Sequence, residues 1–294
     1  MAVVPIAPEP IGGSQAAAAC GIDPFCSRVE LYQRKVSGEQ REASEAMTWG
    51  TLLEPVIADV LRERGYDVVS NGSPIYDPDR PWLVGHPDGY ATVGSSLGVV
   101  EIKTASWRQS WDDGVPVHYQ AQVQHYLHLT GFERAVVACL IGGQRLEVRE
   151  LDRDQRAIDH MLAAEHDFWQ HVVNGEPPAP DGSKSAADAL LAMFPNAHKG
   201  LVHRCDADLW RVWWKYLARR EQRLAVQAQE DEYEAIIKAA IGDADTLISP
   251  RDAEVAHWRN VSRTALDVTR LRKEAPHIYT QYAKETTTRR FTLA

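Results

Sequence analysis

A predicted β-hairpin around Gly94-Ser95-Ser96 constrains the fold of this chain more than any other feature. Strand-like runs flank this turn-forming tripeptide, with Asp88 just before the first run and Glu101-Ile102-Lys103 at the end of the second. Because side chains alternate along a strand, Glu101 and Lys103 share one face while Ile102 points to the core. The hairpin therefore brings two carboxylates and a lysine to one place.

These residue types suit the hydrolysis of a phosphodiester. Hard oxygen ligands such as Asp88 and Glu101 favour magnesium or manganese, and the carbonyl of Ile102 is a candidate third ligand. A divalent ion held there lowers the pKa of a bound water and stabilises charge on the phosphate. Lys103 is then placed to orient or deprotonate that water. The alternative is an exposed turn aspartate beside a surface Glu–Lys pair.

Two further segments offer polar side chains. Glu54 lies in an amphipathic helical pattern over 43–64, where it either faces inward as a carboxylate or belongs to a solvated first turn after a proline kink. Gln122 and Tyr126 are four residues apart in a helical pattern over 116–130 and share one face. Glutamines there hold a water or a phosphate without adding charge, unless they form a solvated face.

The chain divides at a segment rich in proline and glycine, 174–183. We expect one domain over 1–180, with alternating strands and helices. Residues 181–294 form a second, mainly helical part, with a long charged helix over 206–240. The net charge of -9 excludes a globally basic nucleic-acid coat, although DNA binding needs only a local basic surface.

Composition also bounds the compartment. No stretch approaches about 18 uncharged apolar residues, so no membrane-spanning helix is expected. The first residues lack a Lys or Arg ahead of an apolar core, and so do not resemble a secretory signal. The four cysteines are scattered, which predicts reduced thiols in a cytosolic protein: Cys20, Cys26, Cys139 and Cys205.

The order of these motifs resembles the PD-(D/E)XK nucleases. A helix glutamate, then Pro87-Asp88-Gly89, then Glu101-Ile102-Lys103, then Gln122 and Tyr126 is similar to the phage exonuclease family typified by lambda exonuclease, the YqaJ-like viral recombinases. The resemblance covers residues 11–175 and begins at Ile11-Gly12-Gly13-Ser14. It implies an α/β fold: a restriction-endonuclease-like core with a central mixed sheet flanked by helices, followed by a helical C-terminal extension.

The resemblance also implies roles for single residues. Asp88, Glu101 and the Ile102 carbonyl are expected to bind metal, with Glu54 completing a second site; the ions are two Mg²⁺, for which Mn²⁺ can substitute. Lys103 serves the attacking water, and Gln122 lies beside it. Contacts to DNA or its phosphates are expected from three residues: Ser14, Gln124 and Tyr126.

The implied activity is digestion of one strand of linear duplex DNA, 5′ to 3′, giving single strands for recombination. The implied partners are linear DNA ends, a single-strand annealing protein and further copies of the chain in a trimeric or tetrameric ring, in the cytoplasm of a bacterial host. One departure is that no basic residue precedes Ser14, where relatives hold the 5′ phosphate with an arginine. Four later residues are candidates to replace it: Arg28, Arg34, Lys35 and Arg41.

Two alternatives stay open. An endonuclease of the same superfamily would use the same core, although the four-cysteine iron–sulfur type is disfavoured because the cysteines are not clustered. A non-catalytic module that binds DNA ends would keep the fold without cleavage. Trp107 and Trp111 follow the lysine strand and either stack on a base or pack in the core.

Overall fold

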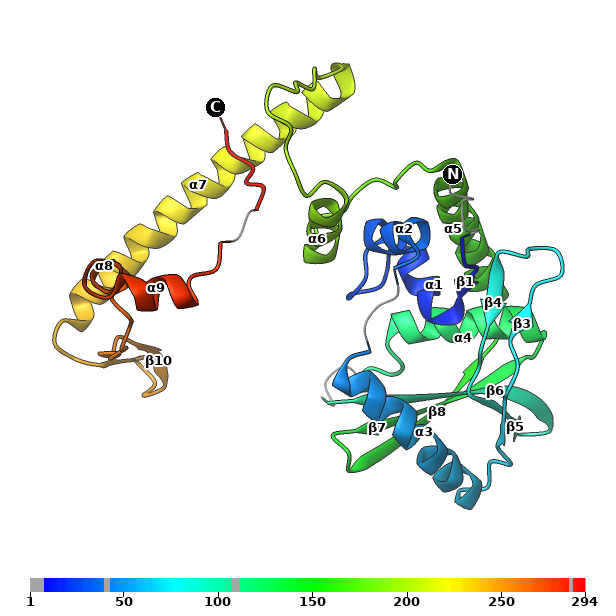
Figure 1. Cartoon of the computed structure of the whole chain (residues 1–294). Coiled ribbons are helices and arrows are strands. Elements are labelled where there is room, and N and C mark those ends of the chain that lie inside the picture. Colours follow the sequence, from blue (N-terminus) through cyan, green and yellow to red (C-terminus); the bar gives the residue numbers. More distant parts are fainter. Residues whose placement is uncertain (1–7, 40–42, 107–110, 286–287, 294) are drawn as a thin grey trace. The chain divides into compact units, whose positions relative to one another are not determined.

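A computed structural model describes residues 8–39, 43–106, 111–285 and 288–293. The chain forms two compact units, Met1–Pro195 (unit 1) and Asn196–Ala294 (unit 2) (Figure 1). The sequence placed a domain boundary at residue 180. In the structure the following helix, α6 (Lys184–Met193), lies within unit 1, because it packs against α2 (Arg28–Ser37) and Ser185 Oγ accepts the Ser27 N–H at 2.8 Å.

A mixed five-stranded sheet forms the centre of unit 1, in the order β2-β5-β6-β7-β8. The pair β6–β7 is parallel and the other pairs are antiparallel. The predicted hairpin is confirmed, since β5 and β6 pair from Gly89↔Val100 to Val93↔Ser96. The five strands are β2 (Val69–Ser70), β5 (Gly89–Val93), β6 (Ser96–Ala105), β7 (Arg134–Ile141) and β8 (Arg145–Asp152).

Helices cover both faces of this sheet (Figure 1). On one face, α3 (Glu45–Glu63) packs Ile57 and Leu61 against Ile102 and its neighbours. On the other face, α4 (Val117–Thr130) packs Val123 and Leu127 against β6 and β7. The predicted fold class, a mixed sheet flanked by helices, is therefore confirmed. Continuous burial along the central strands explains it, because successive apolar side chains of β6 and β7 point to opposite faces and both faces are covered.

A smaller three-stranded sheet joins residues 11–12 to the segment before Asp88. Its order is β1-β4-β3, with β1 parallel to β4: β1 (Ile11–Gly12), β3 (Ile75–Tyr76) and β4 (Leu83–Gly85). Helix α1 (Gly13–Ala19) begins directly after β1, and α5 (Gln155–Asn174) packs near it. Ser14 lies in the first turn of α1 and does not cap it. Gly12 is the N-cap, and the Gln15 side chain accepts its N–H at 3.1 Å.

Unit 2 is built around one long helix, α7 (Ala207–Ile241). A short hairpin follows, β9 (Thr246–Ile248) with β10 (Glu254–His257), and then α8 (Val268–Glu274) and α9 (Pro276–Tyr282). The last two are two helices and not one because Pro276 cannot continue a helix from its middle. In the described part of the chain, no helix is both long and apolar enough to span a bilayer.

Candidate active site

The candidate site lies where β5 parts from β6. Their backbone pairing ends at Gly89↔Val100, and beyond it Asp88 Oδ2 accepts the Ile102 N–H at 2.6 Å. The carboxylate of Asp88 thus replaces a strand as the partner of β6. Since the N–H and C=O of one strand residue point to the same edge, the Ile102 carbonyl also faces this opened edge.

Glu101 is the buried centre of the site, with an exposed fraction of only 1%. Its Oε1 accepts a hydrogen bond from Gln122 Nε2 at 2.6 Å and pairs with Lys103 Nζ at 2.5 Å. Its Oε2 is shielded from solvent and has no hydrogen-bond partner among the described residues. A buried carboxylate oxygen of this kind is costly unless a cation or donor satisfies it.

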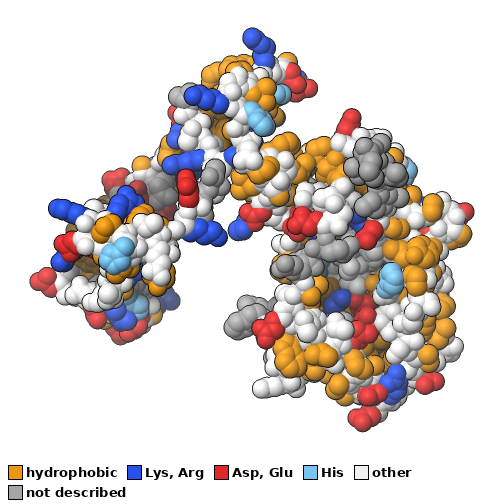
Figure 2. Space-filling view, viewed as in Figure 1, with side chains coloured by type: hydrophobic (Ala, Val, Ile, Leu, Met, Phe, Trp, Pro, Cys, Tyr) orange, Lys and Arg blue, Asp and Glu red, His pale blue; other side chains and the backbone are white. Residues whose placement is uncertain are grey.

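The electrostatics of the site favour a cation. Burial raises the pKa of Asp88 to about 8, and the negative charges of Glu101 and Glu54 add to the rise. Burial also raises the pKa of Glu101, with Lys103 opposing and Glu54 reinforcing that rise. Glu54, which lies in α3, is therefore close enough to act on both carboxylates. Figure 2 shows acidic and basic side chains gathered together in a hollow on one face of unit 1.

The carboxylate side chains do not by themselves form a complete set of metal ligands. No group of three His, Cys, Asp or Glu side chains in the described ranges is arranged to hold an ion. The oxygens that fit a hard cation are instead Glu101 Oε2, the second carboxylate oxygen of Asp88 and the Ile102 carbonyl. This mixed set of carboxylate and backbone oxygens suits Mg²⁺ or Mn²⁺ better than a thiolate metal.

Helix α4 supports the site from behind. Gln122 donates to Tyr126 Oη at 3.1 Å as well as to Glu101, so the predicted pair shares one face and joins the cluster. Tyr126 is buried and packs closely on two glycines: a Cβ at Gly13 would lie 2.2 Å from Tyr126 Cε1, and one at Gly85 would lie 3.1 Å from Tyr126 Cδ1. Tyr126 therefore holds Gln122 in place and is not itself a surface for DNA.

Gln124 lies away from the site, contrary to its expected role at a phosphate. It is buried, its Nε2 donates to the Asp152 carbonyl at 2.8 Å, and its Oε1 accepts the Asp154 N–H at 3.0 Å. These bonds join the end of β8 to the start of α5. Gln124 thus has a structural role, and we do not propose it as a DNA contact. Ser14 is exposed in the first turn of α1, next to Gly13.

Helix α4 also anchors β4, the strand that leads into Asp88. His125 Nε2 donates to the Val84 carbonyl at 3.0 Å, and its Nδ1 lies 2.8 Å from Glu165 Oε1 on α5. Burial alone would lower the pKa of His125, but the adjacent Glu165 carboxylate outweighs it and raises that pKa. His128 reaches Asp77 Oδ2 at 2.7 Å, so α4 holds this segment at two points.

Three of the four candidate replacements for the missing arginine contact groups of the protein itself. Arg28 pairs with Asp167 at 2.6 Å, and Arg34 lies 3.9 Å from Glu30. Lys35 is buried, and its Nζ donates to the Pro10 carbonyl at 2.6 Å. Arg41 and Trp107 fall outside the described residues. Trp111 is buried in the core beside α4, which excludes it as a stacking surface.

Sequence reasoning missed an aromatic group beside Lys103. The ring of Tyr119 lies 5.2 Å from Lys103 Nζ, and His118 and Phe25 continue outward from it. For Phe25, the signal available in the sequence was Asp23-Pro24-Phe25, a turn pattern that presents an aromatic residue between two helices.

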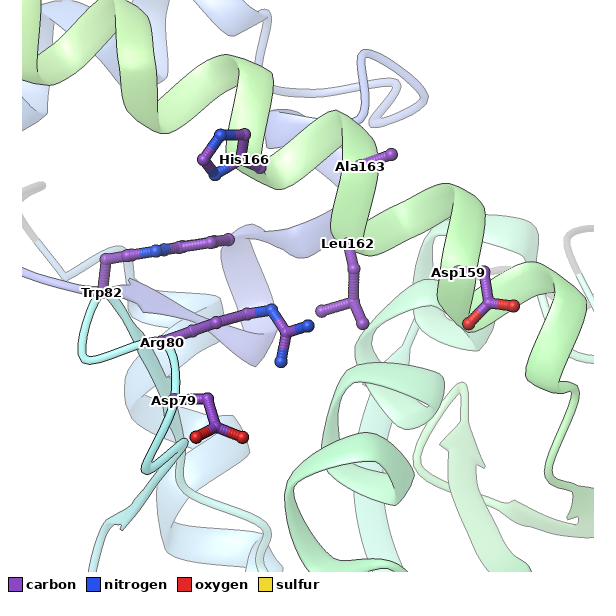
Figure 3. Close-up of a pocket in the computed structure, with 7 residues that line it drawn as sticks. All are labelled: Asp79, Arg80, Trp82, Asp159, Leu162, Ala163 and His166. Carbon is purple, nitrogen blue, oxygen red and sulfur yellow. The ribbon is translucent and has the colours of Figure 1, made fainter.

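A second hollow, of about 590 Å³, lies between the loop before β4 and helix α5 (Figure 3). Arg80 and Trp82 line one side, and Asp159 and His166 line the other. Trp82 stacks on Trp169 with ring centroids 6.2 Å apart. None of its lining residues belongs to the carboxylate cluster, so this hollow is separate from the candidate site.

Comparison with known proteins gives a consistent set of similarities. Residues 5–133 match the model of the YqaJ-like viral recombinase domain. The chain is 30% identical over 290 residues to "Uncharacterized protein YqaJ" of Bacillus subtilis (strain 168), covering 96% of this chain and 90% of that protein.

The solved structures to which the chain is similar include two exonucleases. An alkaline exonuclease (LHK-Exo) from Laribacter hongkongensis is 22% identical, with a TM-score of 0.46 over 56% of this chain and 89% of that chain. A phage related exonuclease from Haemophilus somnus 129PT is 15% identical, with a TM-score of 0.44 over 57% of this chain and 96% of that chain.

Proposed function

Because the chain belongs to the YqaJ-like viral recombinase family, we propose that it is a metal-dependent exodeoxyribonuclease. It degrades one strand of linear duplex DNA, 5′ to 3′, and leaves single-stranded DNA for recombination by annealing. The observation that carries this proposal is the buried Glu101, whose Oε2 has no partner among the described residues and lies on the strand that Asp88 also binds.

In this proposal the ligands of the first ion are Asp88, Glu101 Oε2 and the Ile102 carbonyl, and Glu54 completes a second. When bound, divalent ions lower the pKa of water and stabilise charge developing on the phosphate. Gln122 keeps Glu101 oriented through its 2.6 Å hydrogen bond, and Tyr126 orients Gln122 in turn.

Lys103 acts on the reacting groups themselves. Its ammonium lies among the carboxylates, where it is placed to hold the attacking water and to neutralise charge on the transition state. Ser14, exposed at the start of α1, is proposed to contact a phosphate of the bound strand. The proposal includes a homo-oligomeric ring, trimeric or tetrameric, and a single-strand annealing partner in the cytoplasm.

A cleavage assay on end-labelled DNA tests this function. Linear duplexes carrying a label at the 5′ or the 3′ end, with a 5′ phosphate or a 5′ hydroxyl, are incubated in magnesium, manganese or EDTA beside a closed circle. We expect metal-dependent early loss of the 5′ label and an intact circle. Cutting of the circle would indicate an endonuclease, and no cleavage in either metal would favour a non-catalytic module that binds DNA ends.

Substitutions test the residue assignments. We expect Asp88→Ala, Glu101→Ala and Lys103→Ala each to lower the cleavage rate by about 100- to 1,000-fold or more, because each removes a charge that acts on the transition state. Glu63→Ala is a matched control, since this exposed carboxylate lies at the far end of α3. Circular dichroism checks that the variants remain folded. Wild-type activity in any of the three would remove that residue from the site.

A further inference from the structure

An aromatic run leads from Lys103 to the surface of unit 1. Lys103 Nζ lies 5.2 Å from the ring centroid of Tyr119. The ring of Tyr119 lies 4.0 Å from that of His118, and His118 meets Phe25 edge to face at 5.7 Å. Three rings from two different segments therefore extend from the carboxylate cluster outward.

Phe25 is the exposed end of this run, with an exposed fraction of 68%. Its backbone is fixed, because Asp23 Oδ1 accepts the N–H groups of Phe25 at 2.7 Å and of Cys26 at 3.1 Å. Helix α2 starts just after, capped by the side chain of Ser27. A large aromatic ring on a preorganised turn loses little entropy when it packs against a ligand, which is typical of binding surfaces.

His118 points independently to a ligand at this place. Its Nε2 is shielded from solvent and has no hydrogen-bond partner among the residues that the structure describes. Buried nitrogen atoms of side chains are usually satisfied by protein, water or a bound molecule. The His118 ring, which packs against Phe25, thus also offers a polar atom, Nε2, that no described residue uses.

The charge beside Phe25 indicates which part of a nucleotide this surface binds. Asp23 lies beside Phe25, and its Oδ1 is occupied by two backbone N–H groups. A phosphate is disfavoured next to this carboxylate, whereas the flat face of a base tolerates it. Aromatic side chains bind the bases of single strands in this way, with little dependence on sequence.

We propose that Phe25, backed by His118, is the stacking surface for the base of the nucleotide being removed. This inference rests on the proposed function, since it takes the degraded DNA strand as the occupant. It assigns a binding residue that holds the terminal base apart from its partner strand while the phosphate lies at the carboxylates.

The test removes the ring and the base separately and together. Duplexes carry either a normal nucleotide or an abasic residue at the 5′ end of the degraded strand, and kcat/KM is measured for wild type and Phe25→Ala. Because stacking contributes about 5- to 150-fold, each single change should lower kcat/KM by a factor in that range. Phe25→Ala should lose nothing further on the abasic end. Losses that multiply would overturn the proposal.

Matched variants separate stacking from general damage. Phe25→Trp should retain activity on normal ends, because its ring also stacks. Phe194→Ala removes another exposed phenylalanine of unit 1, with an exposed fraction of 52%, and should match wild type on both ends. Phe25→Ala behaving like Phe194→Ala would overturn the proposal. Thermal unfolding verifies that the variants fold.

A binding measurement makes the inference independent of catalysis. With calcium in place of magnesium, a duplex bearing 2-aminopurine at the 5′ end should be quenched by wild type and not by Phe25→Ala. This result without any cleavage in magnesium would support the base-stacking surface and reject the nuclease proposal. Cleavage by wild type with equal quenching by both proteins would overturn the stacking surface and leave the nuclease proposal standing.

Discussion

Gln122 and Gln124 lie two residues apart on α4, yet they hydrogen-bond to different parts of the molecule. Gln122 donates to Glu101 and Tyr126 within the candidate site. Gln124 joins the backbone of Asp152 to that of Asp154 at the junction of β8 and α5. On this one helix, Gln122 orients the Glu101 carboxylate, whereas Gln124 stabilises the connection between β8 and α5.

We predict opposite consequences for these two residues. Gln122→Ala should lower kcat by about 10- to 100-fold, because Glu101 loses an orienting hydrogen bond. Gln124→Ala should lower the free energy of unfolding by about 1–3 kcal/mol, because buried backbone groups lose their partner, while activity is kept. Urea unfolding and the cleavage assay, run on both variants, measure this. A loss of activity confined to Gln124→Ala would contradict the assignment.

Sequence reasoning placed the charged residues of the candidate site together better than it placed the polar ones. The shared face of Glu101 and Lys103 follows from strand alternation, and Asp88 comes directly before the hairpin strand that pairs with theirs. Helix residues two apart point about 200° apart, so Gln122 and Gln124 cannot both face the site. Composition alone does not say which of the two glutamines faces the site. Phe25 could not be placed from the sequence because it belongs to a turn, which has no periodic pattern.

Among the elements, α4 carries most of the site's support. It holds Glu101 through Gln122, β4 through His125, and Asp77 through His128. Its contact with α1 is close because Gly13 lies against the ring of Tyr126, where any Cβ would overlap. The two adjacent glycines at the start of α1 differ in their surroundings. A Cβ at Gly13 would overlap the Tyr126 ring, whereas a Cβ at the N-cap Gly12 would meet nothing within 4 Å.

This contrast predicts the outcome of two adjacent substitutions. Gly13→Ala should lower the free energy of unfolding by about 1–3 kcal/mol, since the new methyl group must displace a packed ring. It should also lower cleavage, because Tyr126 positions Gln122. Gly12→Ala should lower the free energy of unfolding by less than about 1 kcal/mol, since a Cβ there meets nothing within 4 Å and only the weaker N-cap preference of alanine is left. Thermal or urea unfolding of both variants measures the difference, and equal effects would contradict the packing argument.

Longer elements were predictable, and short ones were not. The hairpin, α4, α5 and α7 have enough residues for a period of two or 3.6 to be seen in the sequence. Strand β1 has only two residues, and its parallel pairing with β4 joins parts of the chain that are far apart in sequence. Such long-range contacts leave no local pattern, so the three-stranded sheet was missed.

At the scale of the molecule, the two units differ in how much they bury. Unit 1 contains all of the apolar clusters found among the described residues. In unit 2, Ile241 is the one described side chain that is buried. Many of its large apolar side chains are exposed along α7, including Trp210 and Trp214. Helical propensity without a core gives little cooperative stability.

We therefore predict that the units behave differently when separated. A chain of residues 1–195 should unfold in one cooperative thermal transition, because its core is complete. A chain of residues 196–294 should show helical circular dichroism that declines gradually on heating, without a sharp transition. Calorimetry of both fragments measures this. A sharp transition for the second fragment, or none for the first, would contradict it.

The hairpin of β5 and β6 has a practical consequence for studying the molecule at work. Its turn at Gly94 lies at one end of the ladder, where Val93 pairs with Ser96, whereas Asp88 and Glu101 adjoin the other end. The register between is set by paired strands, so extra residues in the turn lengthen the loop without shifting the candidate site. A fluorophore or an affinity tag inserted at Gly94 should therefore report on an otherwise native protein.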